Sequence, residues 1–223
     1  MKLFDKLKKN SLLYTEQEME EYESYIEKNF GKIEGIIHEL VSPDIHIDII
    51  VIAPTEKDNY YKLITMGMGA YKMNIPKELK DYELSRAELI LYLPPTWDIN
   101  SNKEEDYWPI RYLKTLARLP LQSNSWLGTG HTISSDEQNS PFASNTKFCS
   151  ILLLNATNLK DEELELTLKT RKTINFYQLF PLYLEEIQYK FDFGTTKLLG
   201  LFSEKDLFPI VNIERKNYCK KIK

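Results

Sequence analysis

The stretch from His46 to Pro94 constrains the fold more than any other part of the sequence, because it contains three apolar runs of strand length. These runs are His46–Ala53, Tyr60–Met66 and Arg86–Leu93, and a Met-Gly-Met-Gly turn overlaps the end of the second. Their apolar residues are partly continuous rather than strictly alternating, which is typical of strands covered on both faces. The sequence therefore predicts a central sheet with other elements packed against both faces.

Helical patterns occur on both sides of these strands along the chain. Thr15–Phe30 has apolar residues at helical spacing, and Thr15 with Glu18 forms a capping box. A second helix is predicted over Asp106–Leu119, with Pro109 tolerated in its first turn. The other predicted elements are strands over Ile33–Leu40 and Phe148–Leu154, one or two strands over Leu164–Leu179, helices over Leu182–Phe191 and Thr195–Ser203, and a long loop over Ser123–Ser144.

The order of these elements sets the expected fold class and domain plan. Strands and helices are mixed without a regular β-α-β alternation, which indicates an α+β fold with a mixed central β-sheet flanked by helices. A chain of 223 residues can bury a large core without disulfides or metals. We expect an N-terminal helix packed on the domain over residues 1–31, a main domain over residues 32–205, and a C-terminal extension over residues 206–223.

Composition and charge narrow the class of protein. The net charge of −4 argues against nucleic acid as the main partner. Cys149 and Cys219 belong to no recognisable motif, which fits a reducing compartment. The sequence predicts neither a signal peptide nor an apolar run as long as a membrane span. We therefore expect a cytoplasmic protein, and its many Lys, Asn and Ile residues point to a bacterial source.

His46 and Asp48 are the first candidates for chemistry. They are two residues apart in a predicted strand and so point to the same face, and His131 in a glycine-rich loop could approach them. Such a set is a conceivable metal or acid-base site. No HxH, CxxC or HExxH spacing supports it, which favours a structural role. We expect no metal, no cofactor and no catalytic residue, and we expect the Asp48 carboxylate to accept hydrogen bonds.

The glycines of the Met-Gly-Met-Gly turn are the next candidates. Gly67 and Gly69 do not form a GxGxxG pattern, and no GK[ST] follows them, so a phosphate-binding loop is not supported. We expect a structural role, in which the end of the strand requires a positive φ or a close approach of two backbones.

Several segments occur in an order typical of one protein family. They are HIDIIVIA, YYKLITMGMGAYKMNIP, RAELILYLPPTWD, YWPIRYLKTLARLP, NSWLGTGHT and FYQLFPLYLEEIQYKF, within about Asp44 to Leu201. In this order they resemble the suppressor of fused domain family. No catalytic residues are established for that family, so the resemblance implies protein binding rather than catalysis.

The resemblance also implies two kinds of partner. The animal suppressor of fused protein restrains a transcription factor of the Hedgehog pathway, and it holds an extended peptide as an added strand between this kind of domain and a second one. By the resemblance, the present chain corresponds to the first of these domains. Short bacterial relatives resemble immunity proteins or antitoxins encoded beside secreted polymorphic toxins.

Three hypotheses about function are therefore open. In the first, which we prefer, a non-catalytic domain neutralises a cognate toxin by stoichiometric binding. In the second, a regulatory module pairs a partner strand with an exposed sheet edge. In the third, a metal-dependent or hydrolytic enzyme uses His46, Asp48 and His131.

The residues we assign to partner binding lie at the ends of predicted elements or in the long loop. Trp97 and Trp126 can anchor an interface or, alternatively, pin loops to the core. His131 lies in the glycine-rich loop between them and the acidic pair. Asp136 and Glu137 would steer a basic, nuclease-like partner toward the surface. The oligomeric state stays open.

Overall fold

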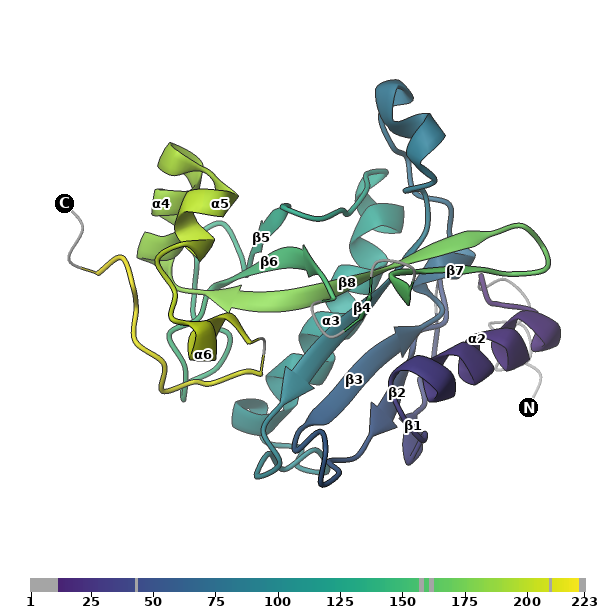
Figure 1. Ribbon diagram of the computed structural model, residues 1–223, viewed down its shortest axis with the longest axis horizontal. Coiled ribbons are helices and arrows are strands. Elements are labelled where there is room, and N and C mark those ends of the chain that lie inside the picture. The colour runs from purple at the N-terminus through teal and green to yellow at the C-terminus, as the bar shows by residue number, and fades with distance from the viewer. Residues whose placement is uncertain (1–11, 43, 157–158, 161–162, 209, 221–223) are drawn as a thin grey trace.

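The computed structural model describes residues 12–42, 44–156, 159–160, 163–208 and 210–220. Within these residues the strands form one eight-stranded sheet with the order β1-β2-β3-β4-β8-β6-β5, and β7 pairs with β8. Helices cover both faces of the sheet (Figure 1), so the predicted α+β fold with a mixed central sheet is confirmed. The expected lysine-rich N-terminus, the break at Pro43 and the last residues of the C-terminal extension lie outside the described residues.

The observed strands follow the apolar runs of the sequence. They are β1 Gly35–Ile37, β2 Asp48–Ile52, β3 Tyr61–Met66, β4 Ala87–Leu93, β5 Thr132–Ser134, β6 Ser150–Asn155, β7 Glu165–Thr167 and β8 Thr173–Leu182. The strand predicted over Ile33–Leu40 is shorter than expected, because the chain leaves the sheet at His38 and Glu39 to contact Asp48. The loop predicted over Ser123–Ser144 contains β5, which carries too few apolar residues for a strand signal.

The helices follow the predicted positions closely. They are α2 Glu16–Asn29, α3 Glu104–Ser123, α4 Leu184–Phe193, α5 Thr195–Leu199 and α6 Glu204–Leu207, with 3-10 turns η1 over Met68–Ala70 and η2 over Lys77–Tyr82. The capping box of α2 is present, since the Thr15 hydroxyl accepts from the Glu18 N–H and the Glu18 carboxylate accepts from the Thr15 N–H. The sequence did not predict η2 or α6. Within the described residues, no helix is long and apolar enough to cross a membrane.

The position expected for Pro109 was wrong. Helix α3 begins at Glu104, with acidic residues in its first turn where the positive end of the helix dipole favours them, so Pro109 lies in the second turn. Proline has no N–H to offer the carbonyl four residues earlier, which belongs to Glu105. The side-chain amide of Asn145 donates to that carbonyl at 3.0 Å and so satisfies it.

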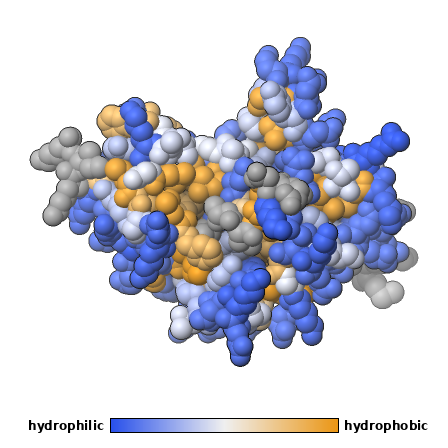
Figure 2. Space-filling view, in the orientation of Figure 1, coloured by the Kyte–Doolittle hydropathy of each residue, from blue (hydrophilic) through white to orange (hydrophobic). Residues whose placement is uncertain are grey.

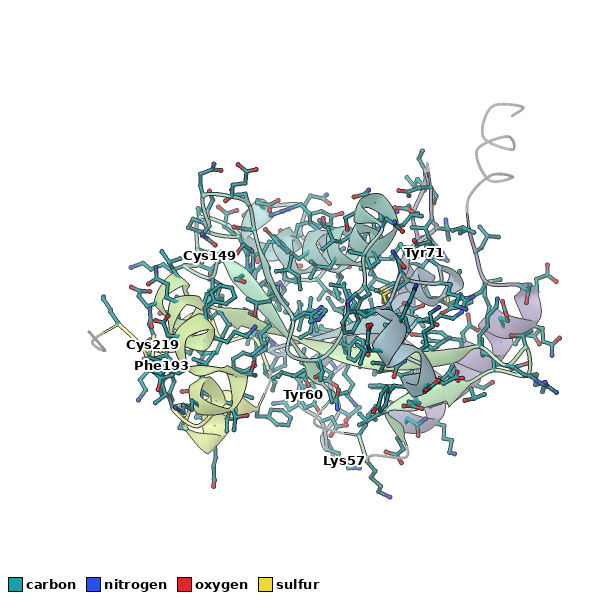
Figure 3. The ribbon with its side chains drawn as sticks, turned by 90° about the horizontal axis from the view of Figure 1, so that it is seen from above. Lys57, Tyr60, Tyr71, Cys149, Phe193 and Cys219 are labelled. Carbon is teal, nitrogen blue, oxygen red and sulfur yellow. The ribbon has the colours of Figure 1, made fainter. Side chains whose placement is uncertain are left out.

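The two faces of the central strands pack against different helices, as the continuous apolar runs predicted. In β2, Ile49 faces a core that includes Trp108 of α3, whereas its neighbour Ile50 faces a core that includes Tyr22 of α2. A third core joins β6 and β8 to α4, α5 and the part of the chain that follows α6, which is called the C-terminal segment below. This core contains Cys149. Figure 3 shows Cys149, Phe193 and Cys219 at this end of the molecule.

The sheet divides between β4 and β8. These two strands pair in parallel over Ala87–Ile90 and Asn175–Gln178. Beyond that point β8 continues with β6, and β4 continues with β3. The C-terminal segment enters this division, where the N–H of Val211 donates to the carbonyl of Tyr92 at 2.9 Å.

Candidate functional site

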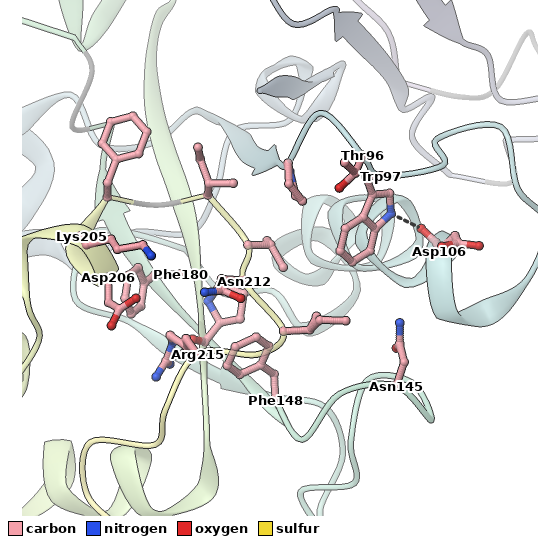
Figure 4. Close-up of a pocket in the computed structure, with 16 residues that line it drawn as sticks. Thr96, Trp97, Asp106, Asn145, Phe148, Phe180, Lys205, Asp206, Asn212 and Arg215 are labelled. Carbon is pink, nitrogen blue, oxygen red and sulfur yellow. Dashed lines mark hydrogen bonds between the residues drawn. The ribbon is translucent and has the colours of Figure 1, made fainter. Parts of the chain in front are cut away.

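A cleft of about 710 Å³ lies beside the division of the sheet (Figure 4). Its walls come from the turn after β4, from the loop before β6, from the end of β8, and from α6 with the C-terminal segment. On the face shown in Figure 2, apolar surface gathers between α5 and α6. The large side chains that line the cleft are Trp97, Phe148, Phe180, Phe208, Ile210, Ile213 and Arg215.

Trp97 is placed for either of the two roles that the sequence left open, which are pinning a loop to the core and anchoring an interface. Its indole N–H donates to the main-chain oxygen of Asp106 at 2.9 Å, and its ring meets that of Trp108 edge to face with centroids 6.0 Å apart. These contacts pin the connection between β4 and α3 to the core. The ring is half-buried and also lines the cleft, so it presents apolar area to an incoming side chain. Its part in partner binding stays a prediction.

Arg215 closes the base of the cleft. Its guanidinium holds the carboxylate of Glu186 through two bonds of 2.6 Å and donates to the carbonyl of Pro181 at 2.9 Å. All of these groups are buried, and four aromatic rings surround the charge, namely those of Phe148, Phe180, Tyr183 and Phe202. The sequence did not reveal this role, because Arg215 falls in the expected C-terminal extension and has no motif around it.

Trp126 and His131 form a second surface, at the end of the sheet order beside β5. Their rings meet edge to face with centroids 4.3 Å apart. The Lys190 ammonium from α4 donates to the carbonyl of Gly130 at 2.9 Å. Burial, together with the neighbouring Lys190 charge, lowers the pKa of His131. His131 therefore favours the neutral imidazole at neutral pH.

Asp136 and Glu137 lie in the turn that follows β5, and both are exposed. The Asp136 carboxylate accepts from the N–H groups of Ser140 at 2.9 Å and Gln138 at 3.0 Å, which builds the turn and lowers the pKa of Asp136. Asp136 thus has a structural task as well as a charge. Electrostatic steering by Asp136 and Glu137 stays a prediction.

The structure separates His131 from His46 and Asp48, because β2 and β5 lie toward opposite ends of the sheet. The Asp48 carboxylate accepts from the Glu39 N–H at 2.8 Å and contacts a ring nitrogen of His46 at 3.1 Å, as the sequence predicted. The second histidine on Asp48 is His38, at 3.0 Å, and not His131 of the candidate set. The residue set of the enzyme hypothesis is therefore not brought together.

Ser42 extends this network but does not make it a hydrolytic site. Its hydroxyl lies 2.7 Å from Nδ1 of His46 and donates to Glu39 at 2.6 Å. A serine that nucleophilic catalysis could use needs an accessible oxygen and a base free to take its proton. Ser42 is buried and engaged on both sides, so the set locks the loop between β1 and β2. Within the described residues, no group of three or more His, Cys, Asp or Glu side chains is arranged to hold a metal ion.

Glu88 is the buried polar centre that the sequence analysis missed. Its side chain is fully buried in β4 and accepts from four donors: the hydroxyls of Tyr14 (2.7 Å) and Thr65 (2.5 Å) and the N–H groups of Gly67 (2.9 Å) and Gly69 (3.0 Å). Burial raises the pKa of Glu88 to about 7, while the hydrogen bonds act in the opposite direction. The feature of the sequence that could have revealed this buried carboxylate is the single acidic residue inside the apolar run AELILYL.

Both glycines of this turn donate to Glu88, and neither has room for a side chain. Gly67 has φ +130°, and a Cβ atom there would lie 2.0 Å from the main-chain oxygen of His46. A Cβ atom on Gly69 would lie 2.1 Å from the hydroxyl of Tyr14. Gly67 has the positive φ and the close approach of two backbones that were expected, whereas the close neighbour of Gly69 is a side chain.

Comparison with known proteins then decides the family. The sequence profile of the suppressor of fused protein family matches residues 43–216, which include both surfaces and Glu88 but not its partner Tyr14. The chain belongs to the suppressor of fused family. An uncharacterized protein of Ureaplasma parvum is 28% identical over 210 residues, which cover 93% of this chain and 98% of that protein.

Solved structures share the suppressor of fused fold at low sequence identity. A suppressor of fused homolog from Neisseria gonorrhoeae has a TM-score of 0.64 at 14% identity and covers 89% of this chain and 95% of its own. A chain of the Sufu-Fu complex has a TM-score of 0.61 at 14% identity, with 90% of both chains covered. Drosophila Suppressor of Fused also has a TM-score of 0.61 at 14% identity, but the match covers 91% of this chain and 50% of that one.

Proposed function

We propose that this suppressor of fused domain is a non-catalytic protein-binding module of the bacterial cytoplasm, and that it neutralises a cognate toxin by binding it one to one. Membership of the family supports protein binding, and so does the Sufu-Fu complex, in which a structurally similar protein is bound to Fu. The preference for a toxin as partner rests on the resemblance to immunity proteins.

The apolar cleft beside Trp97 carries the proposal. Interfaces gain most of their affinity from a few aromatic anchors that enter desolvated pockets. A cleft of about 710 Å³ is large enough to receive one or two such side chains from a partner. Its rim contains Phe208, which is 41% exposed and therefore accessible to a partner.

Three parts of the chain have distinct tasks in this proposal. Residues 1–31 supply helix α2, whose Tyr22 and Ile26 are fully buried against the sheet. Residues 32–205 supply the sheet. Residues 206–223 form a C-terminal extension, and its described part completes one wall of the cleft and carries Arg215.

A matched pair of variants tests the proposal with the product of the toxin gene beside the gene for this protein. Phe208→Ala removes an exposed ring from the cleft, whereas Tyr82→Ala removes a ring that is 66% exposed in η2 and does not line the cleft. We expect calorimetry to show at least a tenfold weaker complex for Phe208→Ala, a loss of about 1.4 kcal/mol, with Tyr82→Ala unchanged. Equal affinities for both variants would contradict the role of the cleft.

A second candidate function is a regulatory module that adds a partner strand to the sheet. β5 lies at the end of the sheet order, and the hydroxyl of Thr132 is buried with no hydrogen-bond partner within the described residues. The contact of Val211 with Tyr92 supports the ability of this sheet to accept a further extended segment. Slower amide exchange over Thr132–Ser134 on partner binding favours this function, while protection confined to the cleft favours the first.

A further inference from the structure

A second cleft, of about 700 Å³, differs from the first in its chemistry. It lies between the residues that follow η1, the β7–β8 turn and the end of α3. Its lining residues are mostly polar, and they include Tyr71, Asn74, Ser85, Asn124 and Thr173. Figure 3 shows Tyr71 on this part of the molecule, well away from Lys57. A cleft of this size matches the volume of small-molecule sites.

The charge of this cleft is opposite to that of the chain. Five lining residues are basic and one is acidic, namely Lys72, Lys80, Arg86, Arg171 and Lys172 against Glu83, whereas the whole chain has a net charge of −4. Lys172 is neutralised by Glu18 at 2.6 Å. Within the part of the chain that the structure describes, Lys72, Lys80 and Arg171 form no ion pair. Concentrated positive charge in a cleft attracts anions more strongly than the same charge on a flat surface.

Arg86 gives the cleft a fixed cation. Its Nη1 donates to the carbonyls of Gly69 at 2.7 Å and Ala70 at 2.8 Å, so the guanidinium is positioned by the backbone of η1. The side chain is half-buried, and burial lowers the pKa of Arg86. Both carbonyl contacts use Nη1, so the opposite edge of the guanidinium, formed by Nε and Nη2, is not used by them. Such an edge can donate to two oxygens of one phosphate.

Arg171 approaches the cleft from the β7–β8 turn. Its φ is +62°, a conformation that a side chain other than glycine adopts at some cost. The turn is closed by the hydrogen bond from the Arg171 N–H to the carbonyl of Leu168 at 2.8 Å. Arg171 is exposed and lines the cleft, so a ligand in the cleft can reach its guanidinium.

We propose that this cleft binds a phosphate-bearing small molecule of about nucleotide size. Arg86 and Arg171 hold the phosphate oxygens, Lys72 and Lys80 supply further positive charge, and the hydroxyl and amide groups of the wall donate hydrogen bonds. The polar wall suits a hydrophilic anion rather than an apolar ligand. The site is independent of the proposed toxin-binding cleft, so either can fail without the other.

Calorimetry of the full chain with pyrophosphate and with ATP, at low ionic strength, tests the site. We expect saturable binding with one molecule per chain, which weakens as salt is raised because charges are screened. The double variant Lys80→Gln/Arg171→Gln should bind at least ten times more weakly. The matched control Lys57→Gln, an exposed lysine outside the cleft, should bind as the unchanged protein does.

Comparison of the probes identifies the source of the phosphate. Tighter binding of ATP than of pyrophosphate indicates a nucleotide, and equal binding indicates that the phosphates alone are recognised. The absence of saturable binding at millimolar concentrations of both probes would overturn the proposal. An equal loss of affinity in Lys57→Gln would also overturn it. A polyglutamate peptide that binds more tightly than either probe would do the same, because the cleft would then be a site for an acidic protein segment.

Discussion

Arg215 and Glu186 form a buried, two-bonded ion pair that ties the C-terminal segment to helix α4, with Nη1–Oε1 and Nη2–Oε2 distances of 2.6 Å. The same carboxylate accepts from the main-chain N–H groups of Tyr183 and Tyr218, both at 3.1 Å. The pair therefore joins two segments of the chain, since Arg215 lies 29 residues after Glu186. Because Arg215 also forms the base of the apolar cleft, the stability of the fold and the shape of the cleft depend on the same contact.

Loss of one partner of this pair is expected to be costly. Arg215→Met leaves the Glu186 carboxylate buried without its counter-charge, and we expect the free energy of unfolding to fall by about 3–5 kcal/mol. Urea titration measures the change. The double variant Arg215→Met/Glu186→Met buries no unpaired charge and should regain part of the loss. A loss below about 1 kcal/mol in the single variant would show that the pair does not hold the segment.

The buried Glu88 makes stability depend on pH. Its pKa in the folded protein is raised to about 7 from an ordinary value of 4.5, so the folded state retains a proton that the unfolded state releases. This stabilisation is fully present below pH 4.5 and is lost as pH rises through about 7. We expect it to amount to about 3 kcal/mol, because each pKa unit corresponds to about 1.4 kcal/mol.

Glu88→Gln provides the control for this pH dependence, since it removes the titration and leaves every other titratable group in place. The difference in free energy of unfolding between the unchanged protein and Glu88→Gln should fall by about 3 kcal/mol from pH 4.5 to pH 8. Chemical denaturation at several pH values measures it. A constant difference would show that the four hydrogen bonds balance burial, and a difference that rises with pH would show that they outweigh it; either result would contradict the raised pKa.

Gly67→Ala is expected to destabilise the fold through a backbone clash. The new Cβ atom would lie 2.0 Å from the main-chain oxygen of His46, in addition to the unfavourable φ of +130°. Gly130→Ala separates these effects, because Gly130 has φ +83° but open space at the same point. We expect a loss of about 1 kcal/mol for Gly130→Ala and at least about 3 kcal/mol for Gly67→Ala. Similar thermal midpoints for the two variants would refute the clash.

Asp48→Ala should destabilise the fold by about 1–3 kcal/mol, because the Glu39 N–H and the ring of His46 lose their acceptor. His38→Ala removes a partner whose side chain is 66% exposed, and we expect a change of no more than about 0.5 kcal/mol. Denaturant midpoints compare the two variants. An unchanged midpoint in Asp48→Ala would mean that this network does not stabilise the loop.

Local patterns predicted the elements of this fold well. The capping box of α2 depends on contacts between Thr15 and Glu18, which lie three residues apart. The alternate burial of Ile49 and Ile50 against two helices follows from the period of a strand, so an apolar run was enough to predict a sheet covered on both faces.

The sites depended instead on contacts between distant residues. Tyr14 and Glu88 are 74 residues apart, and Glu186 and Arg215 are 29 residues apart, so no local spacing reveals either pair. His131 was a candidate partner of Asp48 because nothing in the sequence fixes the strand order, which puts β2 and β5 toward opposite ends of the sheet. The resemblance to the suppressor of fused family indicated the fold, but it did not indicate these contacts.

The stoichiometry of inhibition tests the central claim most directly. The product of the neighbouring toxin gene is held at a fixed concentration well above the expected dissociation constant, and its activity is measured as this protein is added. A binding protein acts by occupancy, so we predict a linear loss of activity that ends near one molecule of this protein per molecule of toxin, as an interface of ordinary size allows at nanomolar affinity. Full inhibition far below equimolar amounts, or no inhibition at micromolar concentration, would contradict the account.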